Sequence, residues 1–79
     1  MKARIYVTLK KGVLDPQGKA VVGALHSMAF NEVKDLRIGK FLEVELDASS
    51  KETEEARLRE MCEKLLANTV IENYRIEIE

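Results

Sequence analysis

The order of secondary structure can be worked out from residues 2–18, which read KARIYVTLKKGVLDPQG. Apolar and polar side chains alternate from Lys2 to Lys10, and this period of two predicts a half-buried strand. Asp15 and Pro16 are typical of a helix start. An aspartate can accept a hydrogen bond from a free helical N–H, and proline at the first helical position has no N–H to leave unpaired. The stretch therefore predicts a strand, a short connection and a helix.

The segment after Pro16 predicts a helix to about residue 29, because its apolar residues fall on one stripe. Phe30 lies off that stripe, so either the helix has ended by Phe30 or its ring packs against something other than the local sheet. Two strands are expected next, at 33–38 and 42–46. A two-residue turn at Gly39-Lys40 would put their apolar residues on opposite faces. We favour a three-residue connection or a bulge through Phe41, which puts them on one face.

The last third of the chain predicts a second helix and a final strand. Ser49 followed by Glu52 matches a capping box that opens the helix. Residues 70–79 alternate again, as a strand does. The apolar stripe of the helix, which we expect to be buried, consists of Leu58, Met61, Cys62, Leu65 and Leu66.

The resulting order, β-α-β-β-α-β, predicts a single α+β domain over residues 1–79. Right-handed crossovers give a ferredoxin-like two-layer sandwich, with a four-stranded antiparallel sheet and both helices on one face. In this arrangement Tyr6 and Phe41 expose large aromatic rings to water on the uncovered face. The residues expected there are Arg4, Tyr6, Thr8, Phe41, Glu43, Glu45, Arg75 and Glu77.

Composition narrows the class of protein. The 79 residues carry 13 Lys+Arg and 14 Asp+Glu, a net charge of −1, which argues against nucleic acid or an anionic membrane as main partner. No stretch is long and apolar enough to span a membrane, and the N-terminus lacks a signal peptide's apolar core. One cysteine cannot form an internal disulfide. We expect one small cytoplasmic domain that is reinforced by self-association, because so short a chain buries little core.

The residue types that could carry chemistry have simpler structural interpretations. His26 has no partner at a spacing that nominates it as a base, and Cys62 lies in the core stripe, so we expect no catalytic residue. Four glutamates alternate with cations along the strands, which favours solvated cross-strand pairs over acid/base groups. The four glutamates are Glu43, Glu45, Glu77 and Glu79. We also expect no metal and no cofactor in this chain.

The loop before the first helix contains glycines, as phosphate-binding loops do. However, Asp15 at the start of the helix would repel an anion. Its apolar residues Val13 and Leu14 instead suggest contact with another chain.

Two motifs carry a resemblance to a known family. The run Gly12-Val13-Leu14-Asp15-Pro16-Gln17-Gly18, followed downstream by Arg37-Ile38-Gly39-Lys40, resembles the PurS family, the small subunits of phosphoribosylformylglycinamidine synthase. The resemblance implies a non-catalytic subunit that bridges a glutaminase subunit and a large synthetase subunit and assists ammonia transfer in purine biosynthesis. ATP and glutamine would be used by those two subunits. A homodimer or a dimer of dimers is expected.

The motif positions give the expected site residues. Val13, Leu14, Asp15, Arg37 and Lys40 are expected to contact partners. Gly12, Gly18 and Gly39 are expected to serve backbone shape, and Asp15, Pro16 and Ser49 to cap helices. An alternative interpretation is a ligand-sensing regulatory domain of the same fold that binds an amino acid.

Overall fold

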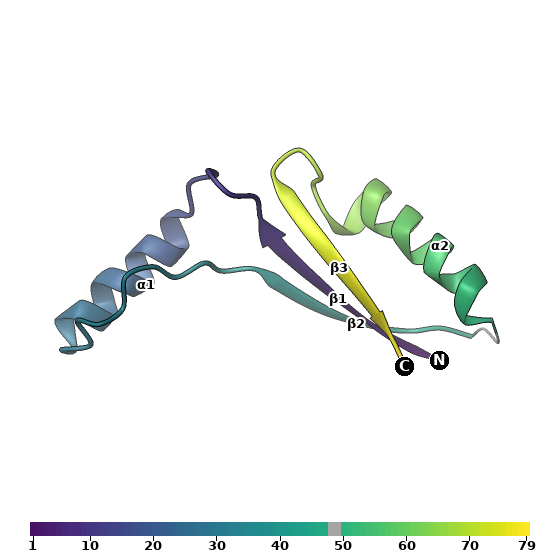
Figure 1. Cartoon of the computed structure of the whole chain (residues 1–79), viewed down its shortest axis with the longest axis horizontal. Coiled ribbons are helices and arrows are strands. Elements are labelled where there is room, and N and C mark those ends of the chain that lie inside the picture. Colours follow the sequence, from purple (N-terminus) through teal and green to yellow (C-terminus); the bar gives the residue numbers. More distant parts are fainter. Residues whose placement is uncertain (48–49) are drawn as a thin grey trace.

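The computed structural model describes residues 1–47 and 50–79 and contains three strands and two main helices (Figure 1). In chain order they are β1 (Lys2–Leu9), α1 (Pro16–Ser27), β2 (Lys40–Glu45), α2 (Lys51–Met61), the short π-helical turn η1 (Cys62–Leu66) and β3 (Glu72–Ile78). The expected α+β class is confirmed. The helix predicted from Pro16 ends at Ser27, before Phe30, which was one of the two alternatives.

The sheet has the order β2-β1-β3, with both pairings antiparallel. Ile5 of the central strand lies opposite Leu42 on one side and Ile76 on the other. The alternation expected for β1 is confirmed over most of its length, because Ala3, Ile5 and Val7 are buried in a cluster with Leu58 and Cys62, while Leu9 at the end of the strand is half-buried. The buried apolar core consists of Ala3, Ile5, Val7, Leu58, Cys62 and Ala67.

The prediction of a fourth strand at 33–38 is wrong for this chain, since the sheet has three strands and this segment is not one of them. The segment runs back beside α1 instead (Figure 1). His26 Nε2 donates to the Val33 carbonyl oxygen at 2.7 Å, and the Ile38 N–H donates to a carboxylate oxygen of Asp15. Polar groups of the segment therefore bond to α1 and its N-cap rather than to a neighbouring strand.

The prediction that both helices cover one face of the sheet is wrong for α1. Within the described residues, packing joins β1 to both other strands and α2 to η1 and β3, and α1 has no comparable contact with any of these elements. Figure 1 shows α1 and the segment after it projecting away from the sheet. We call residues 14–39 the arm, and the sheet with α2 and η1 the body. The radius of gyration, 16.1 Å, reflects this extension, because a compact chain of this length has about 12 Å.

The predicted stripe of α2 is correct except at Leu65. Leu58 and Cys62 are fully buried, whereas Leu65 is 83% exposed. The Ala67 N–H donates to the Cys62 carbonyl oxygen, five residues back, and this wider turn rotates Leu65 away from the sheet. The expected cap Ser49 lies outside the described residues. In the described part, Ser50 is the N-cap, and its Oγ accepts from the Thr53 N–H.

The uncovered face of the sheet carries the aromatic and charged side chains expected there. The Tyr6 and Phe41 rings are 5.1 Å apart, and the Arg75 guanidinium lies 4.2 Å from the centre of the Tyr6 ring. A hydrogen bond from the Tyr6 hydroxyl to Glu77 raises the pKa of Tyr6, because the carboxylate favours the protonated phenol. Charged neighbours pair along the strands: Lys2 with Glu43, Arg4 with Glu79, and Arg75 with Glu77.

Candidate functional site

The two motifs, some twenty residues apart in sequence, meet where the arm joins the body. Asp15 holds them together, because its Oδ1 accepts from the Gly18 N–H at 2.9 Å and its Oδ2 accepts from the Ile38 N–H at 2.8 Å. The side chain is only 5% exposed. These backbone donors, that of Ile38 foremost, hold the pKa of Asp15 below its usual value. Asp15 thus caps α1 and ties the returning segment, residues 33–39, to the start of that helix.

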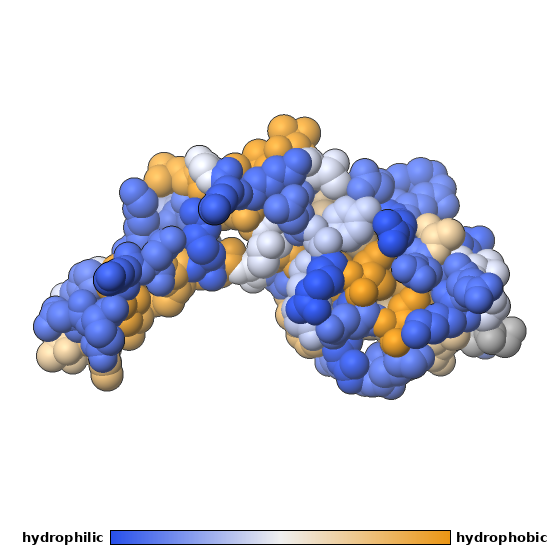
Figure 2. Space-filling model, in the orientation of Figure 1, coloured by the Kyte–Doolittle hydropathy of each residue, from blue (hydrophilic) through white to orange (hydrophobic). Residues whose placement is uncertain are grey.

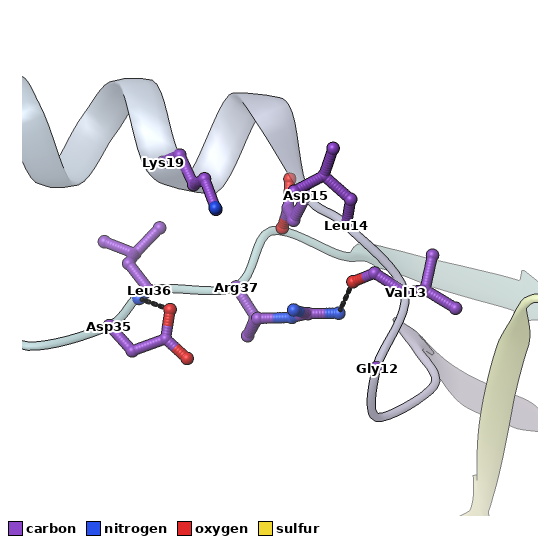
Figure 3. A pocket seen from close by; sticks show the side chains of 8 residues that line it. All are labelled: Gly12, Val13, Leu14, Asp15, Lys19, Asp35, Leu36 and Arg37. Carbon is purple, nitrogen blue, oxygen red and sulfur yellow. Dashed lines mark hydrogen bonds between the residues drawn. The ribbon is translucent and has the colours of Figure 1, made fainter.

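Arg37 closes the same junction from the other motif. Its guanidinium donates to the Val13 carbonyl oxygen at 2.7 Å (Figure 3). It also donates to the Lys10 carbonyl oxygen at 3.3 Å. The Val13 N–H in turn donates to the Lys10 carbonyl, which makes a tight turn around Gly12. Gly12 has φ of 87°, a left-handed conformation that a side chain disfavours. The loop is therefore fixed by its own backbone and by one arginine.

Two glycines allow the chain segments to approach closely at this junction. A Cβ at Gly18 would overlap the Leu36 carbonyl oxygen, and a Cβ at Gly39 would overlap the Val7 carbonyl oxygen. Gly18 therefore lets α1 lie against the returning segment, and Gly39 lets that segment pass β1. Together with Asp15 and Arg37 they form what we call the clamp: Asp15, Gly18, Arg37 and Gly39.

The clamp borders a shallow cavity of about 220 Å³. Figure 3 shows side chains from the loop before α1 on one side of it and from the returning segment on the other. Leu14 is 63% exposed here, and Val13 is half-buried. The lining residues are Gly12, Val13, Leu14, Asp15, Lys19, Asp35, Leu36 and Arg37. The cavity thus places an apolar loop beside two cations, Lys19 and Arg37, and two carboxylates, Asp15 and Asp35.

Four of the five residues expected to contact partners lie together at this junction: Val13, Leu14, Asp15 and Arg37. Lys40 does not line the cavity. Its Nζ donates to the Leu66 carbonyl oxygen at 3.3 Å and lies 3.8 Å from Glu72, so it joins the start of β2 to the end of η1. Asp15 has both oxygens engaged within the chain, whereas Leu14 presents most of its side chain to the surroundings.

Sequence reasoning missed a second feature, an apolar groove of about 460 Å³ between α2–η1 and β2. Leu65, Met61 and Val44 supply its apolar surface. The groove could not be expected from the sequence because Leu65 fits the buried stripe of an ordinary α-helix. The π-helical turn that exposes it leaves no clear mark in the residue pattern. The lining residues are Val44, Arg57, Glu60, Met61, Lys64, Leu65 and Leu66.

The remaining chemical candidates are held in structural roles. His26 is exposed and bonds to a backbone carbonyl. Cys62 is fully buried, and burial raises the pKa of its thiol, which disfavours the reactive thiolate. Among the described residues no cluster of three or more His, Cys, Asp or Glu side chains could hold a metal ion. Within the same part of the chain, none of the helices has the length and apolar character needed to cross a membrane.

The fold and this site define a small α+β protein whose sheet and second helix form the body and whose first helix projects from it. Comparison with known proteins agrees, because a family model described as PurS, phosphoribosylformylglycinamidine (FGAM) synthase, matches residues 2–79. The chain is 58% identical to the phosphoribosylformylglycinamidine synthase subunit PurS of Bacillus subtilis, over 99% of this chain and 92% of that protein. It is 51% identical to the Synechocystis subunit of the same name, over 95% and 75%.

Solved structures give the same result. A crystal structure of the B. subtilis PurS superposes with a TM-score of 0.89 at 58% identity and covers 99% of this chain and 96% of that one. A structure of PurLQS from Thermotoga maritima contains a chain with a TM-score of 0.87 at 34% identity, covering 96% and 93%. The chain belongs to the PurS family.

Proposed function

We propose that this chain is the small, non-catalytic subunit of phosphoribosylformylglycinamidine synthase in purine biosynthesis, where it bridges the glutaminase and ATP-dependent synthetase subunits. The observation that carries the proposal is the family match over residues 2–79. The T. maritima relative comes from a structure of PurLQS, in which that protein is part of an assembly. A role as one subunit of a larger complex fits a chain that presents contact surfaces.

The bridging role gives the chain a part in ammonia transfer without chemistry of its own. Ammonia released at one active site is protonated and lost unless the second site is held close by. A subunit that fixes the distance between the two sites therefore assists the reaction. His26 and Cys62 support this interpretation, because one bonds to a backbone carbonyl and the other is buried as a thiol. ATP and glutamine then belong to the sister subunits, and this chain takes no cofactor and works in the cytoplasm.

The proposed contacts with sister subunits centre on the loop beside the clamp. Leu14 and Val13 supply apolar surface there, and Arg37 holds the loop in place for them. Asp15 acts by keeping the shape of the loop, since its oxygens are already engaged. Lys40 fixes the neighbouring end of β2. The chain also pairs with itself, as a homodimer or a dimer of dimers, because a body with so small a core gains stability from association.

Gel filtration with the two sister subunits, in the presence and absence of glutamine and ATP, tests the bridging role. We expect the three proteins to elute together in at least one of these conditions. Leu14→Asp is expected to weaken this co-elution, whereas Val70→Asp is not, although Val70 is 81% exposed and apolar. Separate elution in every condition contradicts the proposal, as does turnover by this chain alone. A rise in its melting temperature with a free amino acid would favour the regulatory domain instead.

A further inference from the structure

Charge is distributed unevenly along this chain. Residues 10–40, which comprise the loop before α1, the arm and the first residue of β2, carry six Lys or Arg and three Asp or Glu, a net charge of +3. The remaining residues carry seven and eleven of these types, a net charge of −4. The net charge of −1 for the whole chain therefore conceals a basic region and an acidic one, and the two regions attract different surfaces.

The cations at the base of the arm lack carboxylate partners, unlike most cations of the body. Lys2, Arg4 and Arg75 each pair with a glutamate of the sheet. Arg59 and Lys64 each pair with a glutamate four residues earlier. In the part of the chain that the structure describes, no ion pair involves the following four cations, which we call the basic junction: Lys10, Lys11, Lys19 and Arg37. Direct pairing therefore does not neutralise the charge of the basic junction.

The basic junction is gathered around one apolar side chain. The Arg37 guanidinium donates to the Lys10 carbonyl oxygen, which places it against the loop before α1. Lys19 lines the same cavity, and Figure 3 shows it reaching from α1 toward the returning segment. Lys11 and Lys19 are exposed, and Leu14 between them in the chain is 63% exposed. Figure 2 shows hydrophilic side chains over the base of the arm with apolar surface directly beside them.

The two carboxylates that border the cavity do not cancel this charge. Asp15 is buried, and both of its oxygens accept from backbone N–H groups, so it presents little negative charge to a partner. Asp35 is exposed, and one of its oxygens accepts from the Leu36 N–H. The surface of the loop therefore stays positive around Leu14. An apolar centre with a charged rim is common at subunit interfaces.

We propose that the basic junction docks an acidic surface of a sister subunit, with Leu14 entering a small apolar recess in that surface. The inference rests on the proposed function and adds the chemistry of the partner. The positive charges speed the encounter with a negative surface, because charge complementarity acts mainly on the association rate. Leu14 slows dissociation once it is buried, since apolar contacts act mainly on the lifetime of a complex.

A compact acidic patch on a protein fits the basic junction better than a long polyanion does. The body beside the loop belongs to the region with a net charge of −4, and it would repel a nucleic acid that extends beyond the loop. Leu14 also adds apolar surface that a phosphate backbone does not bury. The combination of four cations and one exposed leucine is therefore suited to a protein partner.

Matched charge reversals test this docking. Lys19→Glu reverses a charge of the basic junction in the first turn of α1, and Lys51→Glu reverses an exposed charge in the first turn of α2. A glutamate in either position interacts favourably with the helix dipole, so neither change should weaken its helix. Lys11→Glu adds a second reversal in the basic junction, at an exposed residue of the loop.

Biolayer interferometry of the immobilised chain with the two sister subunits, glutamine and ATP, in about 0.05 M and about 0.5 M NaCl, gives the association and dissociation rates. In the lower salt the double variant K11E K19E is expected to associate roughly tenfold more slowly than the parent chain, with little change in dissociation. The difference should largely vanish in the higher salt, because exposed charges are then screened. Lys51→Glu should match the parent chain, and Leu14→Ala should dissociate faster at both salt concentrations.

The outcomes separate this inference from the proposed function. If the parent chain binds its sister subunits and K11E K19E binds them equally fast, the inference is overturned while the bridging role stands. An equal loss in Lys51→Glu overturns it as well, because total charge would then govern the encounter. A parent chain that binds neither sister subunit in any condition contradicts the proposed function itself.

Two further measurements exclude other occupants of the basic junction. Sedimentation equilibrium of K11E K19E alone should match that of the parent chain, and a change would assign the basic junction to contact between copies and overturn the inference. A single-stranded DNA probe should not bind the parent chain as tightly as the sister subunits do, and such binding, lost in K11E K19E, would overturn it in favour of nucleic acid. Circular dichroism checks that each variant is folded, and the milder K11Q K19Q repeats the test if glutamate disturbs the fold.

Discussion

The body and the arm of this protein are stabilised in different ways. Of the six buried apolar residues in the described chain, five lie in the body, and the sixth, Ala67, directly follows η1. In the arm the buried residues are Asp15 and Gly18, one a carboxylate and the other without a side chain. The body is therefore specified by apolar burial within one chain. The arm is directed by backbone hydrogen bonds at the clamp, and its large apolar residues Val21, Met28 and Phe30 stay exposed.

The largest difference is expected between two leucines of the same helical segment. Leu58→Ala removes a fully buried side chain beneath the sheet, and a cavity there should lower the free energy of unfolding by about 2–5 kcal/mol. Leu65→Ala removes a side chain that is 83% exposed, so its effect on a single chain should be below about 0.5 kcal/mol. Urea titration at low protein concentration measures both. Equal losses would contradict the distinction between body and groove.

Two glycines of α1 are expected to respond in opposite directions. Gly18→Ala forces a Cβ against the Leu36 carbonyl and should destabilise the arm by about 1–3 kcal/mol. Gly23→Ala meets nothing within 4 Å in the middle of the helix, and should stabilise it by about 0.5–1 kcal/mol. Thermal unfolding followed by circular dichroism at 222 nm reports both changes. A neutral or stabilising effect of Gly18→Ala would contradict this, because it would show that the clamp can accommodate a Cβ at this position.

Acidification should loosen the arm before the body. The pKa of Asp15 is lowered in the folded chain by its backbone donors. Its contribution to stability is therefore fully present above its unfolded pKa of about 4 and is lost as the pH falls through the lower folded value. Asp15→Asn should remove this part of the pH dependence, whereas Asp35→Asn, which affects an exposed carboxylate, should retain it. The measurement is the protection of the Gly18 and Ile38 amides from hydrogen exchange, relative to the intrinsic rate at each pH, between pH 7 and pH 2. An unchanged profile in Asp15→Asn would exclude the carboxylate as the cause.

The smallest effect is expected on the uncovered face of the body. Lys2 and Glu43 form an ion pair at 3.3 Å between exposed side chains. Lys2→Ala should cost about 0.2–1 kcal/mol, and the cost should shrink in 1 M salt because exposed pairs are screened. Urea titrations at two salt concentrations check this. A larger and salt-independent loss would mean that the face is covered in the folded protein.

The body could be predicted from the sequence and the placement of the arm could not. The alternation of β1 and the stripe of α2 each repeat over several residues, so local pattern specifies them. The fate of residues 33–38 depends instead on Asp15, a single carboxylate that binds the Ile38 N–H from 23 positions away in the chain. The exposure of Leu65 depends on one additional residue in a helical turn. Both features depend on tertiary contacts, and neither the periodicity of apolar residues nor the composition predicts them.

The motifs show the same division at the candidate site. Asp15-Pro16 could be predicted as a helix start because capping is a local property. The cavity beside Arg37 could not, because it forms only when the loop before α1 meets the returning segment. The groove needs a pairing of β2 with β1 and a π-helical turn at the same time, which no single stretch of sequence encodes.

Hydrogen–deuterium exchange of one sample at decreasing protein concentration tests the central claim most directly. If the clamp rather than apolar burial directs the arm, amides of residues 19–27 should exchange roughly tenfold faster than those of residues 3–7 once dilution has removed any association. Equal protection of both segments at every concentration would contradict the account, because the arm would then be as self-sufficient as the body.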